Sequence, residues 1–341
     1  MAKAKTGVLL VNLGTPDSPS VPDVRKYLRE FLMDKRVIDI PFLSRWLLVN
    51  LIIAPFRAPK SAKIYKELWE DRGSPLMFHG LDLKEKLIQQ LDSNYVVTLG
   101  MRYQSPSISS ALDELIAANV KKIIVLPLFP QYASATTGSV VEQVMDDIKG
   151  RLIIPEIDFI SQYPDDEVMI NTFAKLGRKY MDKIQYDKVV FSYHGLPERQ
   201  IRKSSVDDYC QLNDTCCSTY HTKNQFCYRA QCFLTSRKLA GALQLSDDQY
   251  SVFFQSRLGK DPWIQPYAED EIKRMAAEGI KKILIFSPAF TADCLETTLE
   301  VGEEFKELFI GEGGEEWQLV ESLNSDDLWV ESLKNMVESH T

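Results

Sequence analysis

The chain is built from two halves of similar sequence. Four segments of the first half recur in the second half in the same order: residues 10–16 as 191–197, 95–99 as 250–254, 121–130 as 281–290, and 156–166 as 316–326. The last two pairs share one offset of 160 residues, from 121 to 281 and from 156 to 316. One shared dipeptide would be chance, but four ordered segments indicate an internal repeat of a whole folding unit.

Each half alternates predicted strands with predicted helices. In the first half the strands lie at residues 6–12, 95–99, 122–127 and 157–160, and the helices near 21–33, 61–70, 81–91, 107–118, 137–149 and 165–181. This alternation predicts a parallel sheet covered by helices. The predicted fold class is therefore α/β, with two similar doubly wound, Rossmann-like domains whose four-stranded sheets have the strand order 2-1-3-4.

A length of 341 residues agrees with two domains. We expect the first domain at residues 1–164 and the second at 165–324, with a cysteine-rich insertion at 204–232. The repeat aligns the helix at 165–181 with the last helix of the chain, so each can cross to the opposite domain. The C-terminal segment 325–341 is thus expected to join the first domain.

Composition excludes some classes of function. A net charge of −8 argues against nucleic-acid binding, which requires a basic face. No secretion signal is recognisable among the first residues, so we expect a cytoplasmic protein. Five of the six cysteines lie between Cys210 and Cys232. In such a protein, clustered thiols suggest metal chemistry before disulfides.

The longest apolar run covers residues 46–56 and is too short to span a bilayer. Arg45, Arg57 and Lys60 flank it, and Phe42 and Trp46 are aromatic. Two interpretations remain open, a buried helix or an apolar lip that lies on a membrane or receives an apolar ligand. We expect any membrane contact, for instance with the inner membrane, to be peripheral.

His194 lies at the carboxyl end of a predicted buried strand that Gly195 and Pro197 terminate. Ligands of open α/β sheets bind at this end of the strands. A histidine there can accept protons near neutral pH, ligate a metal, or make only a local hydrogen bond within the turn.

Two glutamates follow the equivalent third strand of the second half. Glu296 and Glu300 are four residues apart, so they share one face of a predicted helix. They can bind a hard cation or relay protons, or they are ordinary acidic residues near a positive helix end. Because the first and third strands flank the switch point of the sheet, we expect His194 and Glu296 to face one crevice.

Three motifs resemble the signature segments of ferrochelatases: SYHGLP at 192–197, DCLET at 293–297 and NLGTP at 12–16. The similarity extends over nearly the whole chain. It implies a lyase that inserts Fe²⁺ into protoporphyrin IX to form protohaem in haem biosynthesis. The family often has histidine where this chain has Cys294, so we expect a buried, inert thiol at that position.

The resemblance also implies roles for individual residues. His194 would be the base or the first metal ligand, Glu296 would face it across the pocket, and Glu300 would lead outward. The substrate Fe²⁺ would bind at His194 and Glu296. Porphyrin-binding residues would be ring-pocket walls, arginines that pair with propionates, and hydroxyl donors: Leu13, Arg57, Tyr65, Arg102, Tyr103, Ser134, Thr136, Ser139 and Trp263.

The cysteine-rich segment resembles that of bacterial ferrochelatases with an internal [2Fe–2S] cluster. Four thiolates can hold such a cluster. The resemblance implies ligation by four of the five cysteines of the segment: Cys210, Cys216, Cys217, Cys227 and Cys232. Structural zinc and free thiols are the alternatives. A cluster here would be structural or a sensor, because metal insertion transfers no electrons.

Other functions remain open at this point. Coproporphyrin III differs from protoporphyrin only in peripheral groups, and the apolar run at 42–56 favours the less polar protoporphyrin. Cobalt or nickel chelatases usually carry a second histidine on the helix of Glu296, which this chain lacks. A non-catalytic haem or iron–sulfur carrier would retain haem and insert no metal. The oligomeric state and the iron donor are not predicted.

Overall fold

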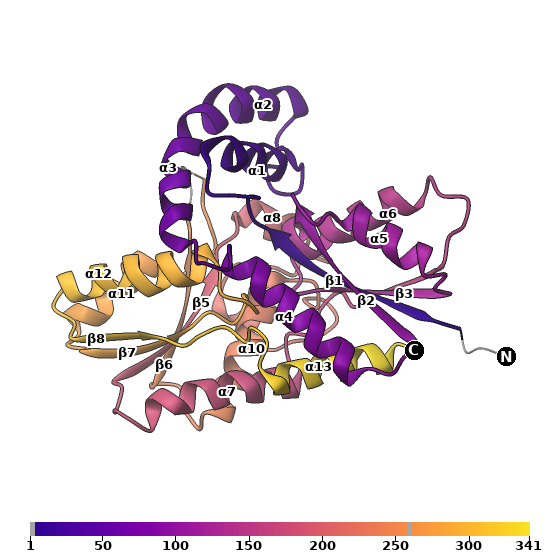
Figure 1. Cartoon of the computed structure of the whole chain (residues 1–341). Coiled ribbons are helices and arrows are strands. Elements are labelled where there is room, and N and C mark those ends of the chain that lie inside the picture. The colour runs from indigo at the N-terminus through magenta and orange to yellow at the C-terminus, as the bar shows by residue number, and fades with distance from the viewer. Residues whose placement is uncertain (1–3, 258, 260) are drawn as a thin grey trace. The chain divides into compact units, whose positions relative to one another are not determined.

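The computed structural model describes residues 4–257, 259 and 261–341 (Figure 1). The chain divides into two compact units. The first contains the chain up to Phe129, Ser134–Ser161 and Val330–Thr341, and the second contains Pro130–Ala133 and Gln162–Trp329. The predicted domain boundaries, 1–164 and 165–324, remain a prediction.

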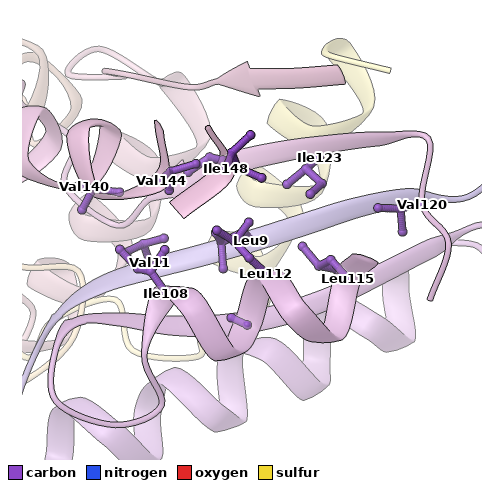
Figure 2. Close-up of a cluster of buried hydrophobic side chains, with 12 residues drawn as sticks. Leu9, Val11, Ile108, Leu112, Leu115, Val120, Ile123, Val140, Val144 and Ile148 are labelled. Atoms are coloured by element: carbon purple, nitrogen blue, oxygen red, sulfur yellow. The ribbon is translucent and has the colours of Figure 1, made fainter. Parts of the chain in front are cut away.

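The first unit contains a four-stranded parallel sheet. Its strands, in sheet order, are β2 (Tyr95–Tyr103), β1 (Thr6–Gly14), β3 (Lys122–Pro127) and β4 (Glu156–Phe159). β1 is buried along nearly its whole length, because a central parallel strand is covered on both faces. Figure 2 shows one of the clusters responsible, in which apolar side chains of β1 and β3 meet those of two helices.

The helical segments of the first unit follow the predicted alternation. They are α1 (Val21–Met33), α2 (Phe42–Leu47), η1 (Leu48–Ile53), α3 (Ala54–Leu68), α4 (Pro75–Gln90), α5 (Ile108–Ala117), η2 (Ser134–Gly138) and α6 (Ser139–Ile148). Ser107 caps α5, because its side chain accepts a hydrogen bond from the Ser110 amide.

The second unit repeats this sheet. Its strands, in sheet order, are β6 (Tyr250–Gln255), β5 (Lys188–His194), β7 (Lys282–Phe286) and β8 (Glu316–Leu319), all parallel. Its helical segments are α7 (Glu167–Met181), α8 (Glu198–Lys203), α9 (Asp214–Ser218), α10 (Tyr228–Ala242), α11 (Ala268–Ala277), η3 (Glu296–Glu304) and α12 (Phe305–Gly311). The C-terminal helix α13 (Asp327–Ser339) begins in this unit, and its residues from Val330 onward belong to the first.

The predicted fold class is confirmed, since both sheets have the strand order 2-1-3-4 within their unit. The helix boundaries were less accurate. The helices predicted at 61–70 and 81–91 begin earlier, at Ala54 and Pro75. Three segments, η1, η2 and η3, are π-helical, which the sequence did not predict. Such segments are uncommon and often occur at functional sites.

Gly177 tests the packing of the second unit. A Cβ atom on Gly177 of α7 would lie 2.3 Å from the ring of Phe286 in β7. We expect Gly177→Ala to lower the free energy of unfolding by about 1–3 kcal/mol, because a buried ring would have to move. Gly241→Ala is the matched control, since no atom lies within 4 Å of its added Cβ in α10. Urea denaturation in which both variants are equally stable would contradict this packing.

Candidate active site and thiol cluster

His194 is the last residue of β5 and pairs in register with Gln255, the last residue of β6. Its side chain is half-buried. Nδ1 lies 2.6 Å from the carbonyl oxygen of Gly195. A carbonyl can only accept, so Nδ1 carries a proton, and in the neutral ring Nε2 is the nitrogen that keeps the lone pair. The local turn bond therefore exists, and it leaves Nε2 as a base or a metal ligand.

Gly195 is required for the turn after His194. Its amide donates a 2.8 Å hydrogen bond to the Gln255 carbonyl. A Cβ atom on Gly195 would lie 2.9 Å from that carbonyl oxygen and 3.2 Å from the Trp263 ring. The Trp263 ring centroid is 6.3 Å from that of His194. The structure thus brings Trp263, a predicted wall residue, beside His194.

Glu300 lies on η3 and is held by the end of β6. Gln255 donates to its carboxylate at 3.0 Å, and the Ser256 hydroxyl donates at 2.7 Å. The Gln255 side-chain oxygen accepts from Ser192, so its amide nitrogen must face Glu300. Ser256 adopts a left-handed φ of 65°, an uncommon conformation that places its hydroxyl here.

Burial raises the pKa of the Glu300 carboxyl. The Ser256 hydrogen bond lowers that pKa, as does the positive charge of His194 when its ring is protonated, whereas the negative charge of Glu296 raises it. His194, Glu296 and Glu300 therefore interact electrostatically in one unit. Glu296 begins η3, and its carbonyl oxygen accepts a 3.4 Å bond from Gln255.

Sequence reasoning did not include Gln255 and Ser256 among the site residues. Only their position could have indicated them. Gln255 ends the strand that neighbours β5 in the predicted order, and Ser256 directly follows it. The bonds to Glu300 span 44 and 45 residues, so no local pattern predicts them.

Arg102 and Tyr103 of β2 converge on Asp34 in the first unit. Arg102 forms an ion pair with Asp34 at 2.8 Å and donates to the Ser139 hydroxyl at 2.6 Å. The Tyr103 hydroxyl donates to Asp34 at 2.9 Å. Asp34 was not predicted, and it already neutralises Arg102, because only 15% and 5% of the two side chains are exposed. Burial raises the pKa of Tyr103, and the charge of Asp34 adds to the effect.

The remaining predicted porphyrin residues also lie in the first unit. The Ser134 hydroxyl in η2 accepts a 2.9 Å bond from Arg36, which pairs with Glu142. Thr136 is half-buried in the same segment. The others differ in exposure: half-buried Leu13 at the end of β1, exposed Arg57 and buried Tyr65, both on α3.

The apolar run near residues 42–56 is exposed over most of its length. Seven large apolar side chains are at least 41% exposed: Phe42, Leu43, Trp46, Leu47, Leu51, Ile52 and Phe56. This favours the apolar lip over the buried helix. Arg45 does not flank the lip as a free cation, because it is buried and donates to the carbonyls of Ile38 and Ile40. None of the described helices is long and apolar enough to cross a membrane.

Four thiols of the cysteine-rich segment contact one another, and we call Cys210, Cys216, Cys217 and Cys227 the four-thiol cluster. The Cys216 and Cys217 sulfurs are 3.8 Å apart. Cys227 hydrogen-bonds to both Cys210 and Cys217, and Cys210 also bonds to Cys216, which closes the ring. All four are free of disulfides. Among the described residues, no group of three or more His, Cys, Asp or Glu side chains has the geometry to hold a metal ion.

Hydrogen bonds within the cluster lower the pKa of two of its thiols and raise that of a third. The bond from Cys227 lowers the pKa of Cys210 to about 6 and that of Cys217 to about 6. Arg229 also lowers the pKa of Cys217, and its guanidinium lies 3.2 Å from that sulfur. The same bonds raise the pKa of Cys227. The hydrogen bond from Cys227 and the charge of Arg229 therefore favour a thiolate within the cluster.

Cys232 and Cys294 are buried away from this ring. Cys232 lies within α10, and its thiol bonds to Tyr228. Cys294 interacts with Thr297, and burial raises its pKa well above the ordinary range. Cys294 is therefore a buried thiol, as expected.

Two solved structures share this fold. They are SirB from Bacillus subtilis with Fe³⁺, at 12% identity and a TM-score of 0.54, and the sirohydrochlorin chelatase SirB from Bacillus subtilis subspecies spizizenii in complex with cobalt, at 11% and 0.52. Each match covers 98% of this chain, and 95% and 94% of the respective structure. At such identity the likeness defines the fold alone, which is that of the chelatases.

Sequence comparison identifies the family to which the chain belongs. A protein-family model described as Ferrochelatase matches residues 5–341. The chain is 44% identical to the ferrochelatase of Legionella pneumophila strain Lens over 333 residues, which is 98% of each protein. It is also 44% identical to the ferrochelatase of Coxiella burnetii strain Dugway over 336 residues, covering 97% of this chain and 93% of the relative. The chain belongs to the ferrochelatase family.

The raised pKa of Glu300 predicts a pH-dependent stability. A carboxyl whose pKa is raised by folding stabilises the folded state below its unfolded pKa, and the contribution is lost as pH rises through the folded pKa. We therefore expect Glu300→Gln to become more stable relative to the wild type between pH 4 and pH 7. Urea denaturation across this range measures the difference. The exposed Glu303→Gln is the control and should follow the wild type; an identical profile for Glu300→Gln would contradict the burial effect.

Proposed function

We propose that this protein is a ferrochelatase that inserts Fe²⁺ into protoporphyrin IX, producing protohaem and two protons. The observation that carries the proposal is the state of His194, whose Nδ1 proton is committed to the Gly195 carbonyl. Its Nε2 lone pair is then available at the carboxyl end of β5. Family membership supports the same reaction.

The proposed mechanism uses His194 and the two glutamates of η3. A free-base porphyrin carries two N–H protons, which must leave before the metal can enter. His194 accepts them as a base, or binds Fe²⁺ first, through Nε2. Glu296 binds Fe²⁺ with His194. Glu300, whose raised pKa suits proton exchange, relays protons outward with help from Gln255 and Ser256.

We also propose that the predicted first-unit residues and Trp263 bind the porphyrin. Arg57 is exposed and can pair with a propionate. Arg102 would first have to share or release Asp34. Its role is therefore better described as one part of a network with Tyr103 and Ser139. Leu13, Tyr65 and Trp263 supply apolar or aromatic walls, and Ser134 and Thr136 supply hydroxyl groups.

The exposed lip supports protoporphyrin over coproporphyrin, because protoporphyrin is the less polar of the two. We propose that the same surface makes a peripheral contact with a membrane, such as the inner membrane. Phe42 and Trp46 are exposed aromatic anchors of the kind that insert into a lipid interface.

We propose that the four-thiol cluster binds a [2Fe–2S] cluster through Cys210, Cys216, Cys217 and Cys227. Their mutual contacts and the two lowered pKa values support thiolate ligation, although the side chains as they stand do not have the geometry to hold a single metal ion. Cys232 is the fifth cysteine and bonds to Tyr228 instead. When bound, the cluster would supply a structural or redox-sensing group, since the insertion reaction transfers no electrons.

His194→Ala tests the proposed reaction. We expect a loss of at least about 10²-fold in kcat, because general-base contributions are of this size, while the fold is kept. Glu296→Gln should also lower kcat. His340→Ala, whose ring bonds only locally near the C-terminus, is the control. The assay mixes protein, Fe²⁺ and porphyrin without oxygen and follows the haem spectrum; wild-type turnover by His194→Ala would refute the role, and haem retention without insertion would indicate a carrier.

Ligation of the cluster predicts a visible spectrum. Protein purified without oxygen should absorb between roughly 400 and 550 nm, as [2Fe–2S] proteins do. We expect Cys227→Ser to lose this absorbance and Cys232→Ser to keep it. Equal loss in both variants would contradict the proposed ligand set, and a colourless wild-type protein would contradict the cluster itself.

A further inference from the structure

The first turn of α10 contacts the strand end that carries His194. Tyr228, the first residue of α10, donates a 3.0 Å hydrogen bond from its hydroxyl to the carbonyl oxygen of His194. Tyr228 is buried and directly follows Cys227 of the four-thiol cluster. The residue next to a cluster cysteine therefore bonds to the backbone of His194.

Arg229 makes a second connection from the same turn. Its guanidinium donates to the Cys217 sulfur at 3.2 Å and to the carbonyl of Gln265 at 3.2 Å. The neighbouring Ile264 amide donates to the carbonyl of Leu196 at 2.9 Å, two residues after His194. The thiols are thus connected to both sides of the His194 turn.

The start of α10 depends on Cys227. Cys227 is the N-cap residue of α10, and its side chain makes no capping hydrogen bond. Its amide is held by the Asn224 carbonyl at 2.9 Å, and its thiol contacts Cys210 and Cys217. The contacts of the Cys227 thiol therefore act directly at the first turn of α10, next to Tyr228.

We propose that Tyr228 is a positioning residue for His194 and that it couples the imidazole to the contacts of the four-thiol cluster. The bond acts on the peptide group between His194 and Gly195. That peptide follows the Cα that carries the imidazole, and it precedes the Gly195 carbonyl that orients Nδ1. Without the Tyr228 bond, this peptide can rotate and move the ring away from its working position. The expected effect on the rate of iron insertion rests on the proposed function. The expected effect on the position of the His194 ring does not.

Tyr228→Phe removes this bond, together with the bond between the same hydroxyl and the Cys232 thiol, and keeps the ring. Tyr193→Phe is the matched control, because the Tyr193 hydroxyl forms an equally buried bond between β5 and α10, 2.8 Å from the Ser236 hydroxyl. We expect both variants to lose similar stability. Only Tyr228→Phe should lower kcat for iron insertion, by about tenfold, with the porphyrin KM unchanged. Equal kcat values in the two variants overturn the proposal.

A second readout needs no activity. The chain has four histidines, so the ¹⁵N signals of its imidazoles can be separated by NMR, and His194→Ala assigns that of His194. The His194 signal should shift in Tyr228→Phe and stay in place in Tyr193→Phe. An unshifted His194 signal in Tyr228→Phe overturns the proposal, whatever the rates are.

The coupling to the thiols is tested by Cys210→Ala. Cys210 is only half-buried, so this variant weakens the contacts of Cys227 with little risk to folding. The substitution should shift the His194 signal when Tyr228 is present and not when Phe replaces it. The same shift in both backgrounds, or none in either, overturns the coupling. If the wild type inserts no iron and these shifts are still seen, the proposed function fails while the positioning role stands.

Discussion

The proposed chemistry depends on one short hydrogen bond, between His194 Nδ1 and the carbonyl oxygen of Gly195. In the neutral ring this bond fixes the tautomer, so that Nε2 is the unprotonated nitrogen at the carboxyl end of β5. The bond exists because Gly195 allows the chain to turn against Gln255 and Trp263, where a Cβ atom would clash. The parallel sheet then places Gln255, the register partner of His194, where it can hold Glu300. An imidazole at the end of β5 and a half-buried carboxyl held at the end of the neighbouring β6 therefore lie in one place.

The internal repeat explains why this site occurs once. Both units use the strand order 2-1-3-4, so both bring the ends of their first and third strands together. In the repeat alignment, however, Leu13 stands in the place of His194 and Thr136 in the place of Glu296. The shared fold provides the geometry. Under the proposed function, a few substitutions assign metal chemistry to the second half and apolar or hydroxyl contacts to the first.

Much of the architecture could be predicted, because periodicity and repetition are local properties of the sequence. The strands and their order followed from the repeat, and His194 followed from its position at a strand end. The pairing of Arg102 with Asp34 and of Glu300 with Ser256 did not, since these bonds join residues 68 and 44 positions apart. The π-helical turns were also missed, because no simple residue pattern predicts them. The resemblance of the cysteine-rich segment implied four ligands among its five cysteines, but it could not tell that Cys232 turns toward Tyr228.

The most direct test of this account is the tautomer of His194 in the resting protein at neutral pH. ¹⁵N NMR of the imidazole, assigned with His194→Ala, distinguishes the two ring nitrogens by their attached protons. The account predicts that the neutral form of the ring carries its proton on Nδ1 and none on Nε2. A proton on Nε2, with Nδ1 bare, would contradict it, because the nitrogen available to porphyrin and iron could not then act as a base or a ligand.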